Sequence, residues 1–248
     1  MSTTRLTLIF PVFNAAPFLR DSLAPLAEWL RARPEVDCIF VNDGSTDDSM
    51  TILEDMKKEF PRPYRIIDQG SNKGKGAAVR AGMQLATGDL VAFTDIDLPY
   101  GLPIFDGMRM MMDKNPSLAF LYGSRSHADS RFAQYGAVRR IGREFFSRVI
   151  RMLAAPDTSD TQCGIKMFRK DFADVVAHRS VIDRFAFDIE LFAIARVNDF
   201  SRKDLPVELV RHKESSVRIG KDTVMMLRDI ARIRERLRRG EYRMQGML

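Results

Sequence analysis

The first apolar run of the chain is LTLIFPVF at residues 6–13, a stretch rich in the residue types that β-strands favour. Residues 16–31 follow with leucines every three or four positions, which is the spacing of one buried helix face. A second short strand is expected at 38–41, and the helix pattern after it is stopped by Pro61. Strands that alternate with helices in this way predict a parallel sheet covered by helices.

The same two patterns recur along the rest of the chain, less regularly in the second half. We expect further strands at 64–67, 90–94, 118–122, 165–168 and 205–210, and further helices at 77–86, 104–112, 138–153, 187–197 and 222–239. The expected fold class is α/β, with a mixed, mainly parallel sheet flanked by helices and an amphipathic helix at the C-terminal end. We divide the chain into a globular domain over 1–220 and a basic helix and tail over 221–248.

The composition is that of a chain that buries a core. Hydrophobic residues make up 45% of the 248 and charged residues 29%, which argues against disordered, collagen-like and coiled-coil proteins. The longest uncharged stretch, 6–19, is shorter than the ~20 apolar residues of a spanning helix. A secretory signal is the alternative, because Arg5 precedes this stretch, but its β-type residues favour a buried strand. Cys38 and Cys163 lie far apart, so neither a disulfide framework nor a zinc site is indicated.

Positive charge is concentrated in two bands of the sequence. The net charge is 39 − 33 = +6; residues 131–151 hold six Arg and one Glu, and residues 221–248 hold eight Lys or Arg and four Asp or Glu. These bands are expected to attract phosphates or an anionic lipid surface. The helix expected at 138–153 suits an interfacial position on such a membrane, with an ordinary domain helix as the alternative. Nucleic acid is not an expected partner, because the basic helices lack interleaved stacking aromatics.

Paired carboxylates at Asp95-Ile96-Asp97 follow the strand expected at 90–94. At positions i and i+2 they point the same way if the backbone stays extended. Such a pair can hold a hard divalent cation that also binds diphosphate oxygens. The alternative is a pair of capping or solvated acids.

Two glycine-containing turns accompany this pair. Asp43 lies in VNDGSTD at 41–47, where turn and N-cap chemistry is the plain alternative to ligand binding. The loop GSNKGKG at 70–76 matches neither the phosphate-loop nor the dinucleotide pattern, and a linker is its alternative.

Five motifs occur in one order: Pro11-Val12-Phe13-Asn14, the Asp43 turn, Asn72-Lys73-Gly74-Lys75-Gly76, the Asp95–Asp97 pair and Asp160-Thr161-Gln162-Cys163-Gly164. This order resembles family 2 glycosyltransferases with the Rossmann-like GT-A fold. Within them the chain is most similar to the dolichyl-phosphate glucosyltransferase and polyprenyl-phosphate glycosyltransferase branch, which also carries a segment like Phe187-Asp188-Ile189-Glu190-Leu191. The likeness runs from about residue 6 to 239. The chain departs from the family at Ala15, where an acid is common, and at Asn42, where Asp is usual.

The resemblance implies a donor site and a metal. By this likeness Asp43 bonds the uracil ring, Asp95 faces the nucleoside, and Asp97 binds Mg²⁺ or Mn²⁺ on the diphosphate. The expected metal ligands are Asp97 and Asp95. The expected donor-binding residues are Pro11, Phe13, Asn14, Asp43, Asn72, Lys75, Asp95 and Ile96.

The same resemblance implies an inverting transferase that moves a hexose, with glucose expected, from a UDP-sugar to a polyprenyl phosphate at the cytoplasmic face of a membrane. A lipid phosphate is largely a dianion at neutral pH and needs no strong general base. An alcohol acceptor would need one, and Asp188 is the candidate, with a helix N-terminal charge as its alternative.

Two arginines are candidate acceptor clamps. Arg125 and Arg131 are expected to bind the acceptor phosphate, with solvated loop charges as the alternative. By family likeness, His212, Ser215, Ser216, Arg218 and Lys221 are expected to form a flap over the diphosphate. The competing functions are the same donor chemistry with a soluble or glycan hydroxyl acceptor, and a non-catalytic nucleotide-sugar or membrane-binding module.

Overall fold

The computed structural model of the protein describes residues 4–125, 160–210 and 221–244. One sheet of seven strands runs through these residues in the order β3-β2-β1-β4-β6-β5-β7. The strands are β1 (Leu6–Val12), β2 (Val36–Asn42), β3 (Arg65–Asp68), β4 (Leu90–Thr94), β5 (Phe120–Ser124), β6 (Ile165–Arg169) and β7 (Arg202–Pro206). Strand β6 is antiparallel to β4 and β5, whereas the other neighbours pair in parallel. The expected mixed, mainly parallel sheet is confirmed.

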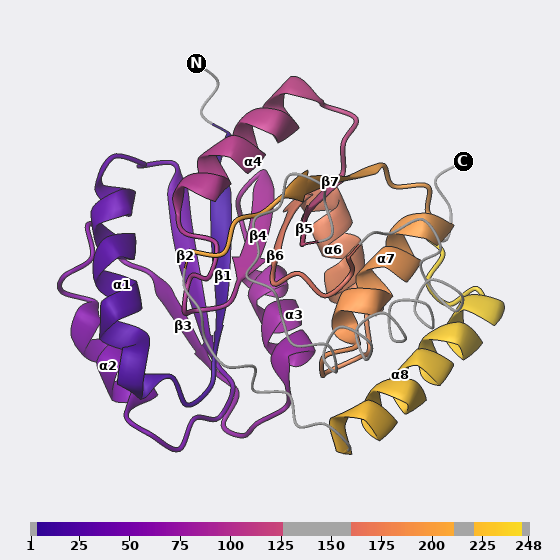
Figure 1. The fold of residues 1–248 in the computed structure, drawn as a ribbon, viewed down its shortest axis with the longest axis horizontal. Coiled ribbons are helices and arrows are strands. Elements are labelled where there is room, and N and C mark those ends of the chain that lie inside the picture. The colour runs from indigo at the N-terminus through magenta and orange to yellow at the C-terminus, as the bar shows by residue number, and fades with distance from the viewer. Residues whose placement is uncertain (1–3, 126–159, 211–220, 245–248) are drawn as a thin grey trace.

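Helices cover both faces of the sheet and make it the middle of three layers (Figure 1). They are α1 (Ala16–Arg31), α2 (Ser49–Met56), α3 (Lys75–Leu85), α4 (Pro103–Lys114), α6 (Lys170–Arg179), α7 (Phe187–Val197) and α8 (Lys221–Arg238). One core cluster takes its side chains from α1, α2 and α4, and the other from α3, α6, α7 and α8. Along β1, Leu8 and Phe10 face the first cluster and Ile9 the second, as the two-residue period of a strand requires.

The sequence pattern predicts the first half better than the second. The helix expected at 16–31 and the strand expected at 90–94 have these bounds in the structure. The last strand, expected at 205–210, instead lies at β7, and α6 has no counterpart among the expected helices. Strand β7 lies at the edge of the sheet and reads RKDLP, so its polar sequence carries little strand signal. The helix expected at 138–153 lies outside the described residues.

The C-terminal helix α8 packs on the domain. Ile230, Ile233 and, beyond the helix, Tyr242 are at most 1% exposed and belong to the core cluster that also contains α7. The division at residue 220 stays a prediction, but the described part of the tail shares the core of the domain. None of the helices in the described ranges combines the length and the apolar content that crossing a bilayer requires.

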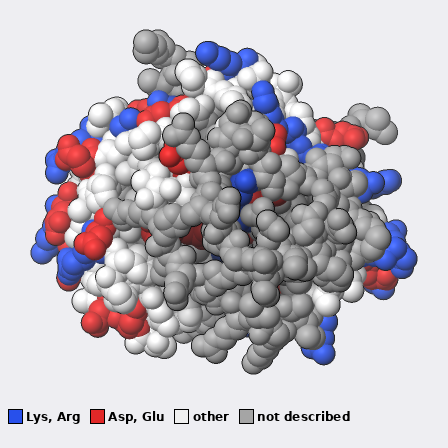
Figure 2. Space-filling model, viewed as in Figure 1, with Lys and Arg blue, Asp and Glu red and all other residues white. Residues whose placement is uncertain are grey.

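Charged side chains of both signs are mixed along the rim of the face shown in Figure 2. On and beyond α8, Arg239 pairs with Glu235 and Arg236 with Glu241. These pairs neutralise part of the basic band at 221–248. The other basic band, 131–151, lies largely within the residues that the structure leaves undescribed.

Candidate active site

The predicted donor-binding motifs meet at one edge of the sheet. Asn14, Asp43 and Asp95 follow β1, β2 and β4, which are neighbours in the order β2-β1-β4. The carboxyl ends of these parallel strands lie at the same edge, which is where open α/β sheets bind ligands.

Asp43 is held by main-chain donors from the 70–76 loop. It is only 4% exposed, and its carboxylate accepts hydrogen bonds from the backbone N–H of Lys73 (2.7 Å) and of Gly74 (2.9 Å) and from Gln69 Nε2 (3.0 Å). Burial raises the pKa of Asp43 above its usual range, although the two N–H donors oppose this shift. The Asp43 turn and the loop are therefore one unit, which the linker interpretation of the loop did not anticipate.

Gly74 lets the loop lie against the segment that precedes α7. Its φ of +113° belongs to the region that side chains disfavour, and a Cβ there would lie 2.5 Å from the carbonyl oxygen of Asp183. Three residues farther on, Ala77 N–H donates to the same oxygen at 3.0 Å. The first turn of α3 is thereby fixed against residues 182–187.

Asp95 pairs with Lys75, the first residue of α3. Lys75 Nζ lies 2.6 Å from Asp95 Oδ1, and the side chains are 20% and 43% exposed. Burial lowers the pKa of Lys75, but the charges of Asp95 and Asp188 outweigh it and raise that pKa above its usual value. The other oxygen, Asp95 Oδ2, would lie 2.3 Å from a Cβ at Gly164, so a side chain there would displace the Asp95 carboxylate. The motifs at 72–76, 95–97 and 160–164 therefore converge on one carboxylate.

The Asp95–Asp97 pair lies in a turn and not on extended backbone. Leu98 N–H donates to Asp95 O at 3.0 Å, and Leu98 has a φ of +51°. The premise that the two carboxylates follow the alternation of a strand is therefore wrong. Both side chains are half-buried.

The donor chemistry at this turn fits a hard cation. Within the described ranges, no group of three or more His, Cys, Asp or Glu residues could hold a metal by itself. Asp95 and Asp97 offer carboxylate oxygens, and Mg²⁺ commonly uses one or two carboxylates and completes its shell with phosphate oxygens and water. A metal here would therefore depend on a phosphate-bearing ligand.

Asp188, the candidate base, is one half of a buried ion pair. Its Oδ1 lies 2.7 Å from Lys166 Nζ, which also donates to the carbonyl oxygen of Cys163 at 2.7 Å. The side chains of Lys166 and Asp188 are 0% and 7% exposed. Asp188 also lies in the first turn of α7, as its alternative interpretation supposed. Its role as a base stays a prediction.

Arg125, which was expected to bind the acceptor phosphate, forms an ion pair with Asp160 in the structure. Arg125 Nε and Nη2 donate to Asp160 Oδ2 and Oδ1 at 2.7 and 2.9 Å, and the Arg125 N–H donates to Asp160 Oδ2 at 3.0 Å. Burial alone would raise the pKa of Asp160, but Arg125 holds it below its usual range. One edge of the guanidinium is thus occupied, so only the remaining N–H groups are available to an acceptor phosphate. Arg131 lies outside the described residues, as do residues 212–218 of the expected flap.

The remaining predicted donor residues differ in exposure. Phe13 is 47% exposed, Asn72 is exposed and Pro11 is half-buried. Asn14 organises its own turn, because its Oδ1 accepts a hydrogen bond from Thr46 N–H at 2.8 Å.

Ile96 is 6% exposed, and its side chain belongs to the core cluster that contains the buried face of α1. Its role in donor binding stays a prediction.

Sequence reasoning missed Lys166, the partner of Asp188. A signal was present, because a lysine in the apolar run Ile165–Phe168 of an expected strand must be buried with a compensating acid or carbonyl. It also assigned no role to Glu190, which is 0% exposed and accepts hydrogen bonds from Val181 N–H, Ile182 N–H and Tyr242 OH.

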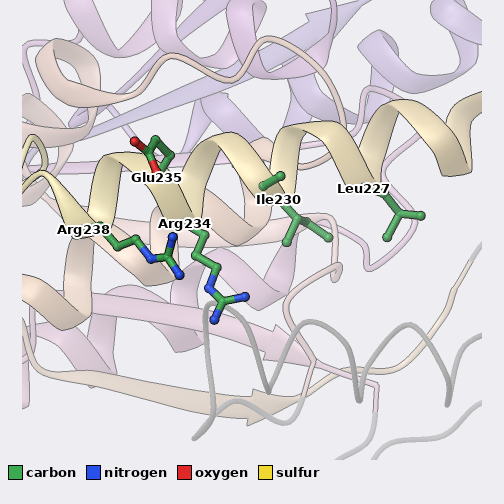
Figure 3. A pocket seen from close by; sticks show the side chains of 6 residues that line it. Leu227, Ile230, Arg234, Glu235 and Arg238 are labelled. Carbon is green, nitrogen blue, oxygen red and sulfur yellow. The ribbon is translucent and has the colours of Figure 1, made fainter.

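A separate hollow of about 290 Å³ lies on α8 (Figure 3). Its lining consists of Leu227, Ile230, Ala231, Arg234, Glu235 and Arg238. None of these residues belongs to the cluster around Asp43 and Asp95.

Comparisons with known proteins agree with this arrangement. The family model described as "Glycosyl transferase family 2" matches residues 7–176. The chain is 28% identical over 224 residues to dolichyl-phosphate beta-glucosyltransferase ALG5C of Trichomonas vaginalis, covering 86% of this chain and 66% of that protein. It is 27% identical over 255 residues to dolichyl-phosphate beta-glucosyltransferase of Mus musculus, covering 98% and 79%.

A solved structure has the same fold. Glucosyl-3-phosphoglycerate synthase from Mycobacterium tuberculosis, crystallised with Mn²⁺, UDP and glucosyl-3-phosphoglycerate, aligns with a TM-score of 0.64 at 14% identity. The alignment covers 98% of this chain and 82% of that one. The expected GT-A fold is thereby confirmed. Because the family model covers more than half of the sequence, the chain belongs to glycosyl transferase family 2.

Proposed function

We propose that the protein is an inverting hexosyltransferase that moves glucose from UDP-glucose to a polyprenyl phosphate. The observation that carries the proposal is the convergence of Asp43, Lys75 and Asp95 at the carboxyl ends of neighbouring strands. Relatives named dolichyl-phosphate beta-glucosyltransferases support glucose as the sugar and a lipid phosphate as the acceptor.

Different groups of the donor site would bind the base and the diphosphate of the nucleotide. Asp43, held by two main-chain N–H groups, presents a fixed acceptor surface for the uracil ring. The first turn of α3 supplies the positive end of a helix and the ammonium of Lys75, both of which favour a diphosphate. Phe13, exposed beside this edge, offers an apolar surface to the nucleoside.

A divalent cation, Mg²⁺ or Mn²⁺, would be held by Asp97 with Asp95. The crystallised Mn²⁺ and UDP complex of a fold neighbour supports this choice. When bound, the cation supplies Lewis-acid stabilisation of the charge that develops on the leaving diphosphate.

The acceptor step needs positioning more than proton transfer. A phosphate oxygen of the acceptor forms the new bond to the anomeric carbon, while the bond from that carbon to the UDP oxygen breaks on the opposite face. Because the acceptor is already an anion, Asp188 has no proton to remove and instead holds Lys166. Arg125, oriented by Asp160, is proposed to bind the acceptor phosphate through its remaining N–H groups, together with Arg131.

We propose a peripheral location at the cytoplasmic face of the membrane. The excess of positive charge in residues 131–151 and 221–248 supports binding to anionic lipids. Co-sedimentation with anionic vesicles, against neutral vesicles as the control, measures this contribution; equal pelleting with both would contradict it.

The test of function is transfer of radiolabelled glucose from UDP-glucose, followed by organic extraction. With polyprenyl phosphate present we expect label in the organic phase, and we expect Asp97→Asn to reduce the rate at least about hundredfold. Asp48→Asn, an exposed acid in the Asp43 turn region, is the matched control and should retain activity.

Two outcomes would separate the competing functions. Label that stays in the aqueous phase but enters a soluble hydroxyl acceptor would replace the lipid with that acceptor. Asp188→Asn, compared with Lys166→Met/Asp188→Leu and with the folded fraction of each variant, would then separate loss of a base from loss of the buried ion pair. UDP-glucose that binds without any turnover would support a non-catalytic module.

A further inference from the structure

Both oxygens of Asp95 have neighbours within the protein. Oδ1 lies 2.6 Å from Lys75 Nζ, and Oδ2 lies against the main chain at Gly164, where a Cβ would be only 2.3 Å away. A cation that approaches Asp95 at Oδ1 therefore meets an ammonium already bound to that oxygen. Repulsion between the two positive charges opposes binding there while Lys75 stays in place.

Lys75 occupies a position that does not favour a positive charge. It is the first residue of α3, and the N-terminus of a helix stabilises anions and destabilises cations. What keeps the ammonium there is the pair of carboxylates of Asp95 and Asp188. A lysine held by nearby acids against a helix dipole is ready to exchange its partner for a phosphate.

The charge balance of the cluster favours joint arrival of cation and nucleotide. The negative charges of Asp95 and Asp188 are each matched by a lysine, Lys75 and Lys166. A divalent cation alone would add two positive charges beside an ammonium. A cation bound to the diphosphate of a nucleotide sugar is neutral overall and adds no net charge.

We infer that Lys75 is a counter-ion that takes the place of the divalent cation on Asp95 until nucleotide and cation arrive together. On their arrival the ammonium moves from Asp95 to a diphosphate oxygen, and the cation takes the vacated carboxylate. The inference rests on the proposed function, since it assumes a nucleotide diphosphate at this edge of the sheet. Its consequence is that the cation binds poorly without the nucleotide.

The experiment measures Mn²⁺ affinity by the electron paramagnetic resonance signal of free Mn²⁺, with and without UDP. In the unmodified protein, UDP should tighten Mn²⁺ binding by at least about tenfold, within the usual range of coupling between two ligands. In Lys75→Met, Mn²⁺ without UDP should bind about tenfold more tightly, because a neighbouring positive charge is gone. The tightening by UDP should shrink to about threefold or less, because the ammonium no longer assists the diphosphate.

Three further variants control for folding and for charge. Lys73→Met removes the same charge from an exposed position in the same loop and should bind Mn²⁺ as the unmodified protein does. Lys75→Arg keeps the charge and should restore the coupling to UDP. Circular dichroism shows whether Lys75→Met is folded. If it is not, Mn²⁺ binding to Lys75→Gln, which also lacks the charge, tests the inference instead.

The results distinguish this inference from the proposed function. Unchanged Mn²⁺ affinity in both Lys75→Met and Lys75→Gln without UDP would overturn the inference and make the ion pair purely structural. Equal effects of Lys73→Met and Lys75→Met would overturn it too, as a general charge effect. Failure of UDP to bind the unmodified protein would contradict the donor assignment, while Mn²⁺ affinity alone would still report on Lys75.

Discussion

Two pairs of acids in this molecule are stabilised in different ways. Asp43 and Glu190 are held by N–H and O–H donors: two backbone N–H groups bind Asp43, and two backbone N–H groups with Tyr242 OH bind Glu190. Asp95 and Asp188 are instead paired with lysine ammonium groups, each at 2.7 Å or less.

These two kinds of partner separate the acids that have a fixed geometry from the acids that can change partners. A backbone donor is fixed by the fold, so a carboxylate bound by it has one geometry. A lysine has a flexible stem and a mobile charge, so a carboxylate bound by it can give up its partner to a ligand. The partly exposed pair at Asp95 has room for such an exchange, whereas the buried pair at Asp188 has none.

The largest expected effect comes from breaking the buried lysine-held pair. Lys166→Met leaves Asp188 buried without its counter-ion and should lower the free energy of unfolding by about 3–5 kcal/mol. Urea unfolding measures this. The double variant Lys166→Met/Asp188→Asn should regain much of the loss, because no uncompensated charge remains.

The matched control is the more exposed ion pair between Lys170 and Asp174 on α6. Lys170→Met removes the partner of Asp174, whose side chain is 43% exposed, and should cost less than about 1 kcal/mol. Similar losses for Lys166→Met and Lys170→Met would show that burial does not separate the two kinds of pair.

A smaller effect is expected at the backbone-held acid of the donor site. Asp43→Asn replaces one acceptor oxygen with an N–H₂ group that faces main-chain donors, and it should lower the free energy of unfolding by about 1.5–3 kcal/mol. UDP affinity, measured by calorimetry, should fall as well.

Asp48→Asn serves as the control, since the exposed side chain should keep stability within about 0.5 kcal/mol. An Asp43→Asn protein that is destabilised but binds UDP normally would remove Asp43 from the donor site and leave it a structural residue.

The smallest expected effect is a change of pH dependence at Glu190. Burial raises the pKa of Glu190 although its three donors oppose the shift. A raised pKa means that the folded state holds the proton more tightly, so this contribution to stability is complete below the ordinary glutamate value of about 4.3 and is lost as the pH rises through the raised pKa. Glu190→Gln lacks this titration.

Urea unfolding across that pH window compares the two proteins. The stability advantage of the unmodified protein over Glu190→Gln should decline as the pH rises. Glu28→Gln, an exposed acid, should run parallel to the unmodified protein. Parallel curves for Glu190→Gln would contradict the assignment of this pH dependence to Glu190.

Sequence patterns predicted the first half of the fold because its strands are buried and its helices amphipathic. The helix at 16–31 carries its leucines on one stripe, and β4 is buried along its whole length. The second half was harder, because β7 is a polar edge strand and the antiparallel placement of β6 is a long-range pairing. The hydrophobic periodicity of a segment does not indicate which distant strand it pairs with.

For the site, the sequence indicated several acids and two of the cations beside them, Lys75 and Arg125, but it did not indicate which residues pair. Asp43 and Asp95 were predicted through motifs, and the structure brings them to one edge. Lys166 and Asp160 gain their partners only when segments far apart in the chain meet, at Asp188 and Arg125. Such pairings follow from tertiary packing and not from spacing.

The hydrogen bonds between Arg125 and Asp160 hold together two segments that are distant in the sequence. These three bonds join the end of β5 to the segment before β6, so the two ends of the intervening sequence are tied together independently of its length. Long insertions between tethered ends cost little, since closure entropy grows slowly with length. A change in the number of residues between Arg125 and Asp160 should therefore leave the pairing of β5 with β6 stable.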